Sequence, residues 1–262
     1  MKDNRPKIGL ALGAGASRGL AHIGVLQILE EHGIVPDFIA GSSIGALIGA
    51  LYAAGISPKM IGGIASELDM KMYYDVGVPR LGFMKGDKLE ELIKILTRGR
   101  TFNELKIPLK VTAVDLKTNK LVIIDEGIVH RAVRASISIP GIFTPVFDGD
   151  QVLVDGGLLE RIPTRIVRDM GADIVIGSDV GFMGQHGDAS NILGIILQSF
   201  EVMELAIINN RICDDDIIIY PKLSTINPLL FDKADECIEV GREATLQAID
   251  KIVDRINDCI AK

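Results

Sequence analysis

Short apolar runs alternate with stretches of helical periodicity along most of this chain. Strand-length runs occur at 8–12, 37–43, 172–180 and 216–223, and helical patterns at 17–33, 44–55, 161–171 and 191–215. Strands that alternate with helices build a parallel sheet, because each helix carries the chain back across the sheet. The sequence therefore predicts a three-layer α/β fold: a mostly parallel central sheet with helices on both faces.

Three further segments interrupt this alternation. The stretch 109–127 predicts a hairpin that turns at Thr118-Asn119, and 57–105 predicts a cap-like region of helices and irregular loops that begins at Ser57-Pro58. A helix is expected from about 233 to 262. With 48% hydrophobic residues and no linker, repeat or low-complexity run, the 262 residues are expected to form one domain, 1–262.

Charge and cysteine usage exclude several classes of protein. A net charge of −7 argues against a nucleic-acid partner and against a polybasic membrane patch. The three cysteines are scattered, which is typical of a reducing compartment. Basic residues before an apolar stretch imitate a secretory signal, but glycines break that stretch, which favours a first strand at Ile8–Leu12. We expect a cytoplasmic protein with at most peripheral membrane contact.

The sequence Gly41-Ser42-Ser43-Ile44-Gly45 lies between a predicted strand and a predicted helix. It fits G-x-S-x-G, the turn that lifts a nucleophilic serine out of the packing, and Ser43 is the serine of that pattern. The two glycines allow close backbone approach around a strained residue. The alternative is a helix start that Ser42 or Ser43 caps.

A glycine-rich loop follows the first predicted strand. It contains Gly13, Ala14, Gly15, Ala16, Ser17, Arg18 and Gly19. A P-loop would end in G-K-[ST], and a dinucleotide loop would be followed by an acid after the second strand; neither is present. This leaves an oxyanion hole of backbone N–H groups, or a loop that only permits tight helix–strand packing. Arg18 would add a positive charge or brace the loop.

A base for Ser43 has to be found elsewhere in the chain. His22 and His32 belong to the first predicted helix, His130 is expected at the surface, and only His186 in a polar loop has a claim to a triad. The other candidate is Asp155, which ends the strand 151–155 and precedes Gly156-Gly157. An ordinary aspartate is a weak base toward a hydroxyl, so burial would have to raise its pKa. An Asp-Gly turn without function is the alternative.

The stretch 134–146, "RASISIPGIFTPV", is broken by proline and glycine. It is not expected to form regular structure. Because it lies just before Asp155, we expect it to line the site.

Four blocks in this order resemble the patatin-like phospholipase family: the loop with "RGLAHIGVL", then "GSSIG", "ASISIPGIF" and "VDGG". The resemblance covers about residues 8–180. It implies a Ser43–Asp155 dyad, an oxyanion hole in the loop 13–19 with Arg18 as its basic residue, and a lipid acyl hydrolase without metal, cofactor or catalytic histidine. The family's loop usually carries three consecutive glycines where this chain has Ala14-Gly15-Ala16, which puts the strength of the oxyanion hole in question.

The sequence thus favours a serine esterase or lipase that acts on a lipid or fatty-acyl ester. Residues 57–105, with Tyr73, Tyr74 and Phe83, would cover an acyl-chain channel or be ordinary helices. Because of Ala14 and Ala16, a weakly active or non-catalytic regulatory protein on the same fold is the alternative. A conventional α/β-hydrolase with His186 is the third hypothesis. A homo-oligomer is also consistent with the sequence.

Overall fold

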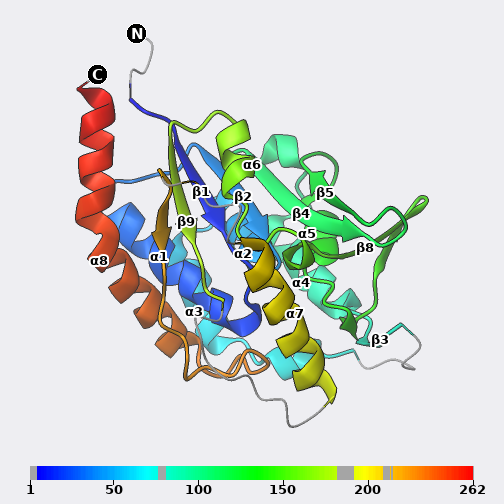
Figure 1. Cartoon of the computed structure of the whole chain (residues 1–262). Coiled ribbons are helices and arrows are strands. Elements are labelled where there is room, and N and C mark those ends of the chain that lie inside the picture. Colours follow the sequence, from blue (N-terminus) through cyan, green and yellow to red (C-terminus); the bar gives the residue numbers. More distant parts are fainter. Residues whose placement is uncertain (1–4, 76–80, 182–191, 209–212, 214, 262) are drawn as a thin grey trace.

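The computed structural model describes residues 5–75, 81–181, 192–208, 213 and 215–261. Its main sheet has the strand order β10-β9-β1-β2-β4-β8-β7 (Figure 1). The first five strands run parallel to their neighbours, while β8 pairs antiparallel with β4, and β7 with β8. In chain order these strands are β1 (Ile8–Leu12), β2 (Phe38–Ser42), β4 (Leu109–Asp115), β7 (Val146–Asp148), β8 (Gln151–Asp155), β9 (Ile174–Ser178) and β10 (Ile217–Ile219).

Helices cover both faces of this sheet, which confirms the predicted three-layer α/β fold. On one face lie α1 (Ala21–Glu31), α2 (Ile44–Ala53) and α5 (Val129–Ser136), with α3 (Pro58–Glu67), α4 (Asp87–Thr97) and α8 (Ala234–Ile260) packed around them (Figure 1). The other face carries α6 (Thr164–Asp169), which packs on β1, β2 and β9. α7 (Ile192–Ile208) contacts the 3₁₀ turn η4 (Gly156–Leu158).

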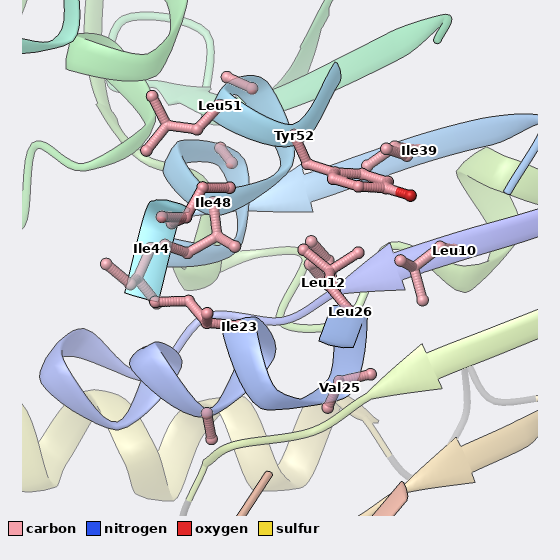
Figure 2. Packing of buried hydrophobic residues seen from close by; sticks show 14 of the residues in the cluster. Leu10, Leu12, Ile23, Val25, Leu26, Ile39, Ile44, Ile48, Leu51 and Tyr52 are labelled. Carbon is pink, nitrogen blue, oxygen red and sulfur yellow. The ribbon is translucent and has the colours of Figure 1, made fainter. Parts of the chain in front are cut away.

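The two faces of β1 have different side chains, and this sets the thickness of each layer. Leu10 and Leu12 point into the large core formed with α1 and α2 (Figure 2). Gly9 and Ala11 face α6, where a Cβ atom on Gly9 would lie 2.7 Å from that of Ala172. Small residues therefore let α6 approach the strands closely, while branched side chains fill the opposite layer.

The expected hairpin at 109–127 is present as β4 and β5 (Lys120–Ile124), which pair antiparallel from Asp115 and Lys120 outward. Asn119 adopts φ +55°, a left-handed conformation that asparagine tolerates. The helix at Ser57-Pro58 is also confirmed, since the Ser57 hydroxyl accepts a hydrogen bond from the Met60 amide.

Two expectations need correction. The stretch 134–146 is more regular than expected: it completes α5 and contributes β6 (Gly141–Phe143) and the first residue of β7. β6 is stabilised by parallel pairing with β3 (Gly82–Met84), a distant partner that the local pattern does not reveal. The first helix also starts differently, as the 3₁₀ turn η1 (Ala16–Leu20), before α1 begins at Ala21. The remaining 3₁₀ turns are η2 (Met70–Tyr73) and η3 (Phe102–Glu104).

A bilayer-spanning helix is not found in the part of the chain that the structure describes, where every helix is too short or too polar to cross.

Candidate active site

Ser43 occupies the sharp turn between β2 and α2. Its backbone has φ +54° and ψ −125°, a conformation that costs a non-glycine residue on the order of 1–3 kcal/mol. The surrounding packing enforces it: a Cβ on Gly45 would lie 2.2 Å from the Leu12 carbonyl oxygen, and one on Gly41 would lie 2.5 Å from Ala46 Cα. The Ser43 amide donates to the Ser136 hydroxyl at 2.9 Å. The two glycines therefore permit the close approach that the motif predicts.

The two adjacent serines have different environments. Ser42 is fully buried, and its hydroxyl oxygen accepts a hydrogen bond from Thr112 Oγ1 of β4 at 2.8 Å. Ser43 is the first residue before α2, yet its hydroxyl makes no capping hydrogen bond to that helix. Its Oγ points instead at Asp155. Ser43 therefore occupies the N-cap position of α2, but without the side-chain hydrogen bond that helix capping would provide.

Asp155 is held by two hydrogen bonds at the end of β8. Its Oδ2 accepts from Ser43 Oγ at 2.5 Å, and its Oδ1 accepts from the Gly157 amide at 2.8 Å. The following turn passes close to β4, because a Cβ on Gly156 would lie 2.1 Å from Thr112 Oγ1. The Asp-Gly-Gly turn thus presents one carboxylate oxygen to the serine and fixes the other.

The pKa of Asp155 is raised to about 7, chiefly because burial removes water from its carboxyl group. The hydrogen bonds from Ser43 and Gly157 act in the opposite direction, since they stabilise the carboxylate. Burial therefore supplies the increase in basicity that a carboxylate needs to accept a hydroxyl proton near neutral pH.

Two N–H groups of the glycine-rich loop remain available near Ser43. The amides of Gly13, Ala14 and Ser17 donate to the carbonyl oxygens of Ser178, Arg161 and Pro228, in that order. Within the described residues, the amides of Gly15 and Ala16 have no acceptor, and both residues line a cavity with Ser43. The amides of Gly15 and Ala16 are therefore the candidates for the oxyanion donors expected in the loop 13–19.

The two alanines of this loop are accommodated differently. Ala14 keeps a negative φ, and its side chain fills the space beside Gly157, where a Cβ would lie 2.8 Å from that of Ala14. Ala16 adopts φ +50°, a left-handed conformation that is strained for a residue with a Cβ atom. Its amide has no acceptor among the described residues. Of the two alanines, only Ala16 is therefore strained. Both N–H groups that have no acceptor in the described part of the chain, those of Gly15 and Ala16, are still present.

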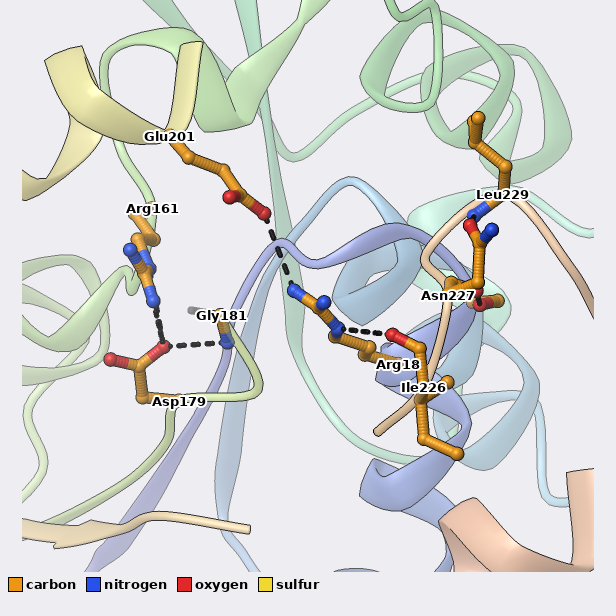
Figure 3. Close-up of polar contacts among 9 residues, drawn as sticks. Arg18, Arg161, Asp179, Gly181, Glu201, Ile226, Asn227 and Leu229 are labelled. Atoms are coloured by element: carbon orange, nitrogen blue, oxygen red, sulfur yellow. Dashed lines mark hydrogen bonds and ion pairs between the residues drawn. The ribbon is translucent and has the colours of Figure 1, made fainter. Parts of the chain in front are cut away.

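Arg18 braces the loop. Its Nε donates to the Ile226 carbonyl oxygen at 3.0 Å, and its Nη1 forms an ion pair with Glu201 of α7 at 3.3 Å (Figure 3). Beside this pair, Arg161 forms a buried ion pair with Asp179 at 2.8 Å (Figure 3). The charge of Arg18 is therefore shared with Glu201 while the side chain fixes the loop to two other segments.

Of the four histidines, none that the structure describes contacts Ser43. His22 is buried in α1, where Nε2 donates to the Gly13 carbonyl oxygen at 2.9 Å and burial lowers its pKa to about 4. His32 lies at the end of α1, as expected. His130 is buried rather than at the surface, because α4 covers α5 and Glu90 bonds its Nδ1 at 3.0 Å. His186 lies outside the described residues.

A large apolar cavity of about 310 Å³ opens beside Ser43. Its walls include Ile61 and Ala65 of α3, Leu92 and Leu96 of α4, and Tyr74. Tyr73 and Phe83 do not belong to this lining, and Phe83 is exposed. The cap-like region 57–105 thus contributes much of an apolar cavity at the serine.

A second, smaller cavity of about 70 Å³ meets the first at Ser43. It is lined by Asp155, by the amide-bearing Gly15 and Ala16, and by Glu201 and Glu204 of α7. The sequence analysis missed these two glutamates. Two acids three residues apart in an otherwise apolar helix are the signal that could have identified them.

A search for three or more His, Cys, Asp or Glu side chains that could jointly bind a metal ion finds no group among the described residues.

The fold and these contacts define a class of α/β proteins in which a serine on a strained turn after the second parallel strand faces an aspartate on an antiparallel strand. A model of the patatin-like phospholipase family matches residues 10–168. The chain belongs to the patatin-like phospholipase family.

Individual proteins agree with this assignment. An uncharacterized NTE family protein of Mycobacterium tuberculosis is 34% identical over 186 residues, which cover 68% of this chain and 52% of that protein. A lysophospholipase of Pyricularia oryzae is 26% identical over 281 residues, or 94% of this chain and 19% of the relative. The chain thus spans about half or less of the length of these relatives. The crystal structure of VipD from Legionella pneumophila shares the fold, with a TM-score of 0.68 at 14% identity, over 95% of this chain and 67% of that one.

Proposed function

We propose that this chain is a serine hydrolase of lipid or fatty-acyl esters that uses Ser43 and Asp155 as a catalytic dyad. The observation that carries this proposal is the 2.5 Å hydrogen bond from Ser43 Oγ to a buried carboxyl group whose pKa is raised to about 7. A nucleophile needs a base within hydrogen-bond reach, and this pair meets that requirement directly.

The reaction follows from the atoms around Ser43. Ser43 Oγ attacks the ester carbonyl carbon while its proton moves to Asp155 Oδ2. The amides of Gly15 and Ala16 donate to the carbonyl oxygen as it becomes negatively charged. The C–O bond then breaks, the departing alcohol takes the proton from Asp155, and an acyl-enzyme remains. A water molecule gives a proton to Asp155 and attacks the acyl carbon. The bond from that carbon to Ser43 Oγ then breaks, Asp155 returns the proton to Oγ, and the fatty acid is released.

The apolar cavity supports a lipid-like acyl group. Its walls are largely aliphatic, and burial of methylene groups contributes about 0.8 kcal/mol each to binding. The family itself is described as patatin-like phospholipase, and the relative in Pyricularia oryzae is named a lysophospholipase. Both descriptions agree with a lipid ester as the substrate class, and neither identifies the substrate of this chain.

Hydrolysis of p-nitrophenyl esters of graded acyl length tests the proposal. Ser43→Ala and Asp155→Asn are expected to lose kcat/KM by on the order of a thousandfold or more, as other nucleophile knockouts do. Ser42→Ala and Asp150→Asn are the matched controls, since Ser42 bonds to Thr112 and Asp150 is exposed. Both should retain activity within about threefold, because neither faces the reacting atoms.

Two outcomes would contradict the proposal. An equal loss in His186→Ala would favour a histidine-dependent triad. A wild-type protein that hydrolyses none of the esters and is not labelled by a fluorophosphonate probe would favour the regulatory alternative raised by Ala14 and Ala16.

A further inference from the structure

The arrangement of the two cavities indicates where the acyl half and the alcohol half of an ester substrate would lie. They share Ser43, Ala16, Ile139 and Pro228, so they meet where the carbonyl carbon must lie. The large cavity has the apolar walls that suit an acyl chain. The small cavity is lined by Asp155, the group that returns a proton to the departing alcohol. If the acyl chain occupies the large cavity, the alcohol has to leave through the small one.

Among the described residues, the charged side chains that line the small cavity are all acidic: Asp155, Glu201 and Glu204. The nearby cations are paired with other acids, although Arg161 Nη1 has no hydrogen-bond partner among the described residues. Arg18 is paired with Glu201, and Arg161 bonds Asp179 through both Nε and Nη2, at 3.1 and 2.8 Å. When Asp155 and Glu204 are ionised, an alcohol in this cavity therefore meets a negative potential that these arginines offset only in part.

Of these three acids, Glu204 has the fewest hydrogen-bond and ion-pair partners among the described residues. Among the described residues it has no hydrogen bond or ion pair, whereas Glu201 has Arg18. It lies beside the catalytic turn: a Cβ on Gly157 would be 3.3 Å from Glu204 Oε1 and 3.0 Å from Asp155 Oδ1. Burial raises the pKa of Glu204 to about 8. The charge of Arg161 acts in the opposite direction, and the neighbouring acids Asp155, Glu201 and Asp179 add to the rise. A cation beside this carboxyl would stabilise its ionised form, and an anion would be repelled.

We propose that Glu204 makes the small cavity selective for esters whose leaving alcohol carries a positive charge, over neutral alcohols of the same shape and over anionic ones. This inference rests on the proposed function, because it takes Ser43 as the point of attack. Glu204 acts as a specificity residue for the alcohol, while α3 and α4 determine the fit of the acyl chain.

Three hexanoate esters with different alcohols test this selectivity. Hexanoylcholine is cationic, 3,3-dimethylbutyl hexanoate is its neutral isostere, and 2-sulfoethyl hexanoate is anionic. For the wild-type protein, kcat/KM should be about tenfold higher for the cationic ester than for the isostere, and lowest for the anionic ester. In Glu204→Gln the ratio of cationic to neutral ester should fall to about one, because the carboxyl group that distinguishes the two alcohols is gone.

Glu243→Gln on the exposed face of α8 is the matched control and should keep the wild-type ratio. A ratio of cationic to neutral ester that is the same in the wild type and in Glu204→Gln would overturn the inference, even if both proteins hydrolyse p-nitrophenyl hexanoate. So would a wild-type preference for the anionic ester.

Binding to the Ser43→Ala variant separates this inference from the proposed function. Calorimetric titration should show hexanoylcholine binding about tenfold more tightly than the neutral isostere, and the difference should disappear in Ser43→Ala/Glu204→Gln. If this preference is found while the wild type hydrolyses no ester, the cavity assignment stands and the hydrolase proposal fails. Equal binding of both esters would refute the cavity assignment.

Discussion

At the scale of the residue, the proposed chemistry depends on the solvent that Asp155 has lost. The carboxyl group is buried and receives two hydrogen bonds, one from Ser43 Oγ and one from the Gly157 amide. Burial outweighs both bonds, so the group keeps its proton to a higher pH than an exposed aspartate. In the proposed mechanism, this single side chain takes the role that a histidine has in many serine hydrolases.

The pH dependence of hydrolysis should reflect this. Asp155 accepts a proton only as a carboxylate, so kcat/KM for a neutral ester is expected to rise with pH, with an apparent pKa near 7, and then to level off. An aspartate with an ordinary pKa near 4 would give a flat profile between about pH 5 and pH 9. Initial rates for p-nitrophenyl butyrate across that range distinguish the two cases.

The same burial should reduce stability. The native pKa of Asp155 lies above its unfolded value, so the unfolded chain releases this proton first as the pH rises, and stability falls between about pH 4 and pH 7. Asp155→Asn removes the ionisation and keeps an acceptor for the Gly157 amide. We expect it to be more stable than the wild type by on the order of 2–4 kcal/mol at pH 8, and by little at pH 4.

Urea unfolding at both pH values measures this difference. Asp150→Asn, at an exposed position, should change stability by less than about 0.5 kcal/mol at either pH. A lower stability of Asp155→Asn at pH 8 would mean that the hydrogen bond from Ser43 outweighs the burial of the charge.

At the scale of the element, the site forms where consecutive segments end near one another. β1 leads into the glycine-rich loop, β2 into the serine turn, and β8 into the Asp-Gly-Gly turn. Parallel strands bring their carboxyl ends to one edge of the sheet, which is where ligand sites form in such folds. β8 runs antiparallel to β4 and delivers Asp155 opposite Ala113, beside the turn that carries Ser43.

Much of this arrangement could be predicted from the sequence, because it is encoded locally. The alternating periods predict the strands and helices that frame the sheet, and the glycines around Ser43 and after Asp155 mark turns that only small residues allow. The contact between Ser43 and Asp155 itself needed the family resemblance or the structure, since 112 positions separate the two residues.

The remainder depends on contacts between distant segments. β6 exists because it pairs with β3, and His130 is buried because α4 covers α5. Glu201 and Glu204 face the site only because α7 packs against the turn after Asp155. The local sequence pattern does not distinguish the first two cases from an irregular loop or an exposed histidine. The acid pair in an apolar helix marks Glu201 and Glu204 but does not show what they face.

The helices α3 and α4 should control the accepted acyl length. Ala65 of α3 lines the large cavity, and Ala65→Phe places a ring in it. We expect kcat/KM for p-nitrophenyl dodecanoate to fall about tenfold or more, and that for the acetate to change by less than about threefold, since a shorter chain leaves room for the ring. Ala261→Phe, just after α8, is the control.

The thermal midpoint of Ala65→Phe should be measured beside its activity, since overpacking costs typically 1–3 kcal/mol. An equal loss for acetate and dodecanoate would contradict the assignment of this cavity to the acyl chain.

At the scale of the whole molecule, one core joins segments that are distant in sequence. The large hydrophobic cluster contains residues from β1, α1, α2, α4, α5 and α8, and α8 packs along α1. We propose on this basis that residues 1–262 form a single domain that includes the cap-like region 57–105 and the C-terminal helix. Peripheral membrane contact, a homo-oligomer and a cytoplasmic location stay predictions.

A single domain should unfold in one cooperative step. The calorimetric enthalpy of unfolding is expected to equal the van't Hoff enthalpy, and circular dichroism and tyrosine fluorescence should give the same midpoint. Two separate transitions, with 57–105 exchanging its amide hydrogens before the sheet does, would show that the cap-like region is an independent unit.

The division of the lining between two sets of helices has a consequence for how such a protein diversifies. The walls of the large cavity belong mostly to α2, α3, α4 and the connection between α3 and α4. Two of the three acids of the small cavity, Glu201 and Glu204, belong to α7, and four residues are common to both cavities. Substitutions in one set leave the other set's walls in place. A lineage could therefore change its preference for one half of the substrate and keep its preference for the other half. A library that combines variants of both sets should yield proteins whose acyl and alcohol preferences vary independently.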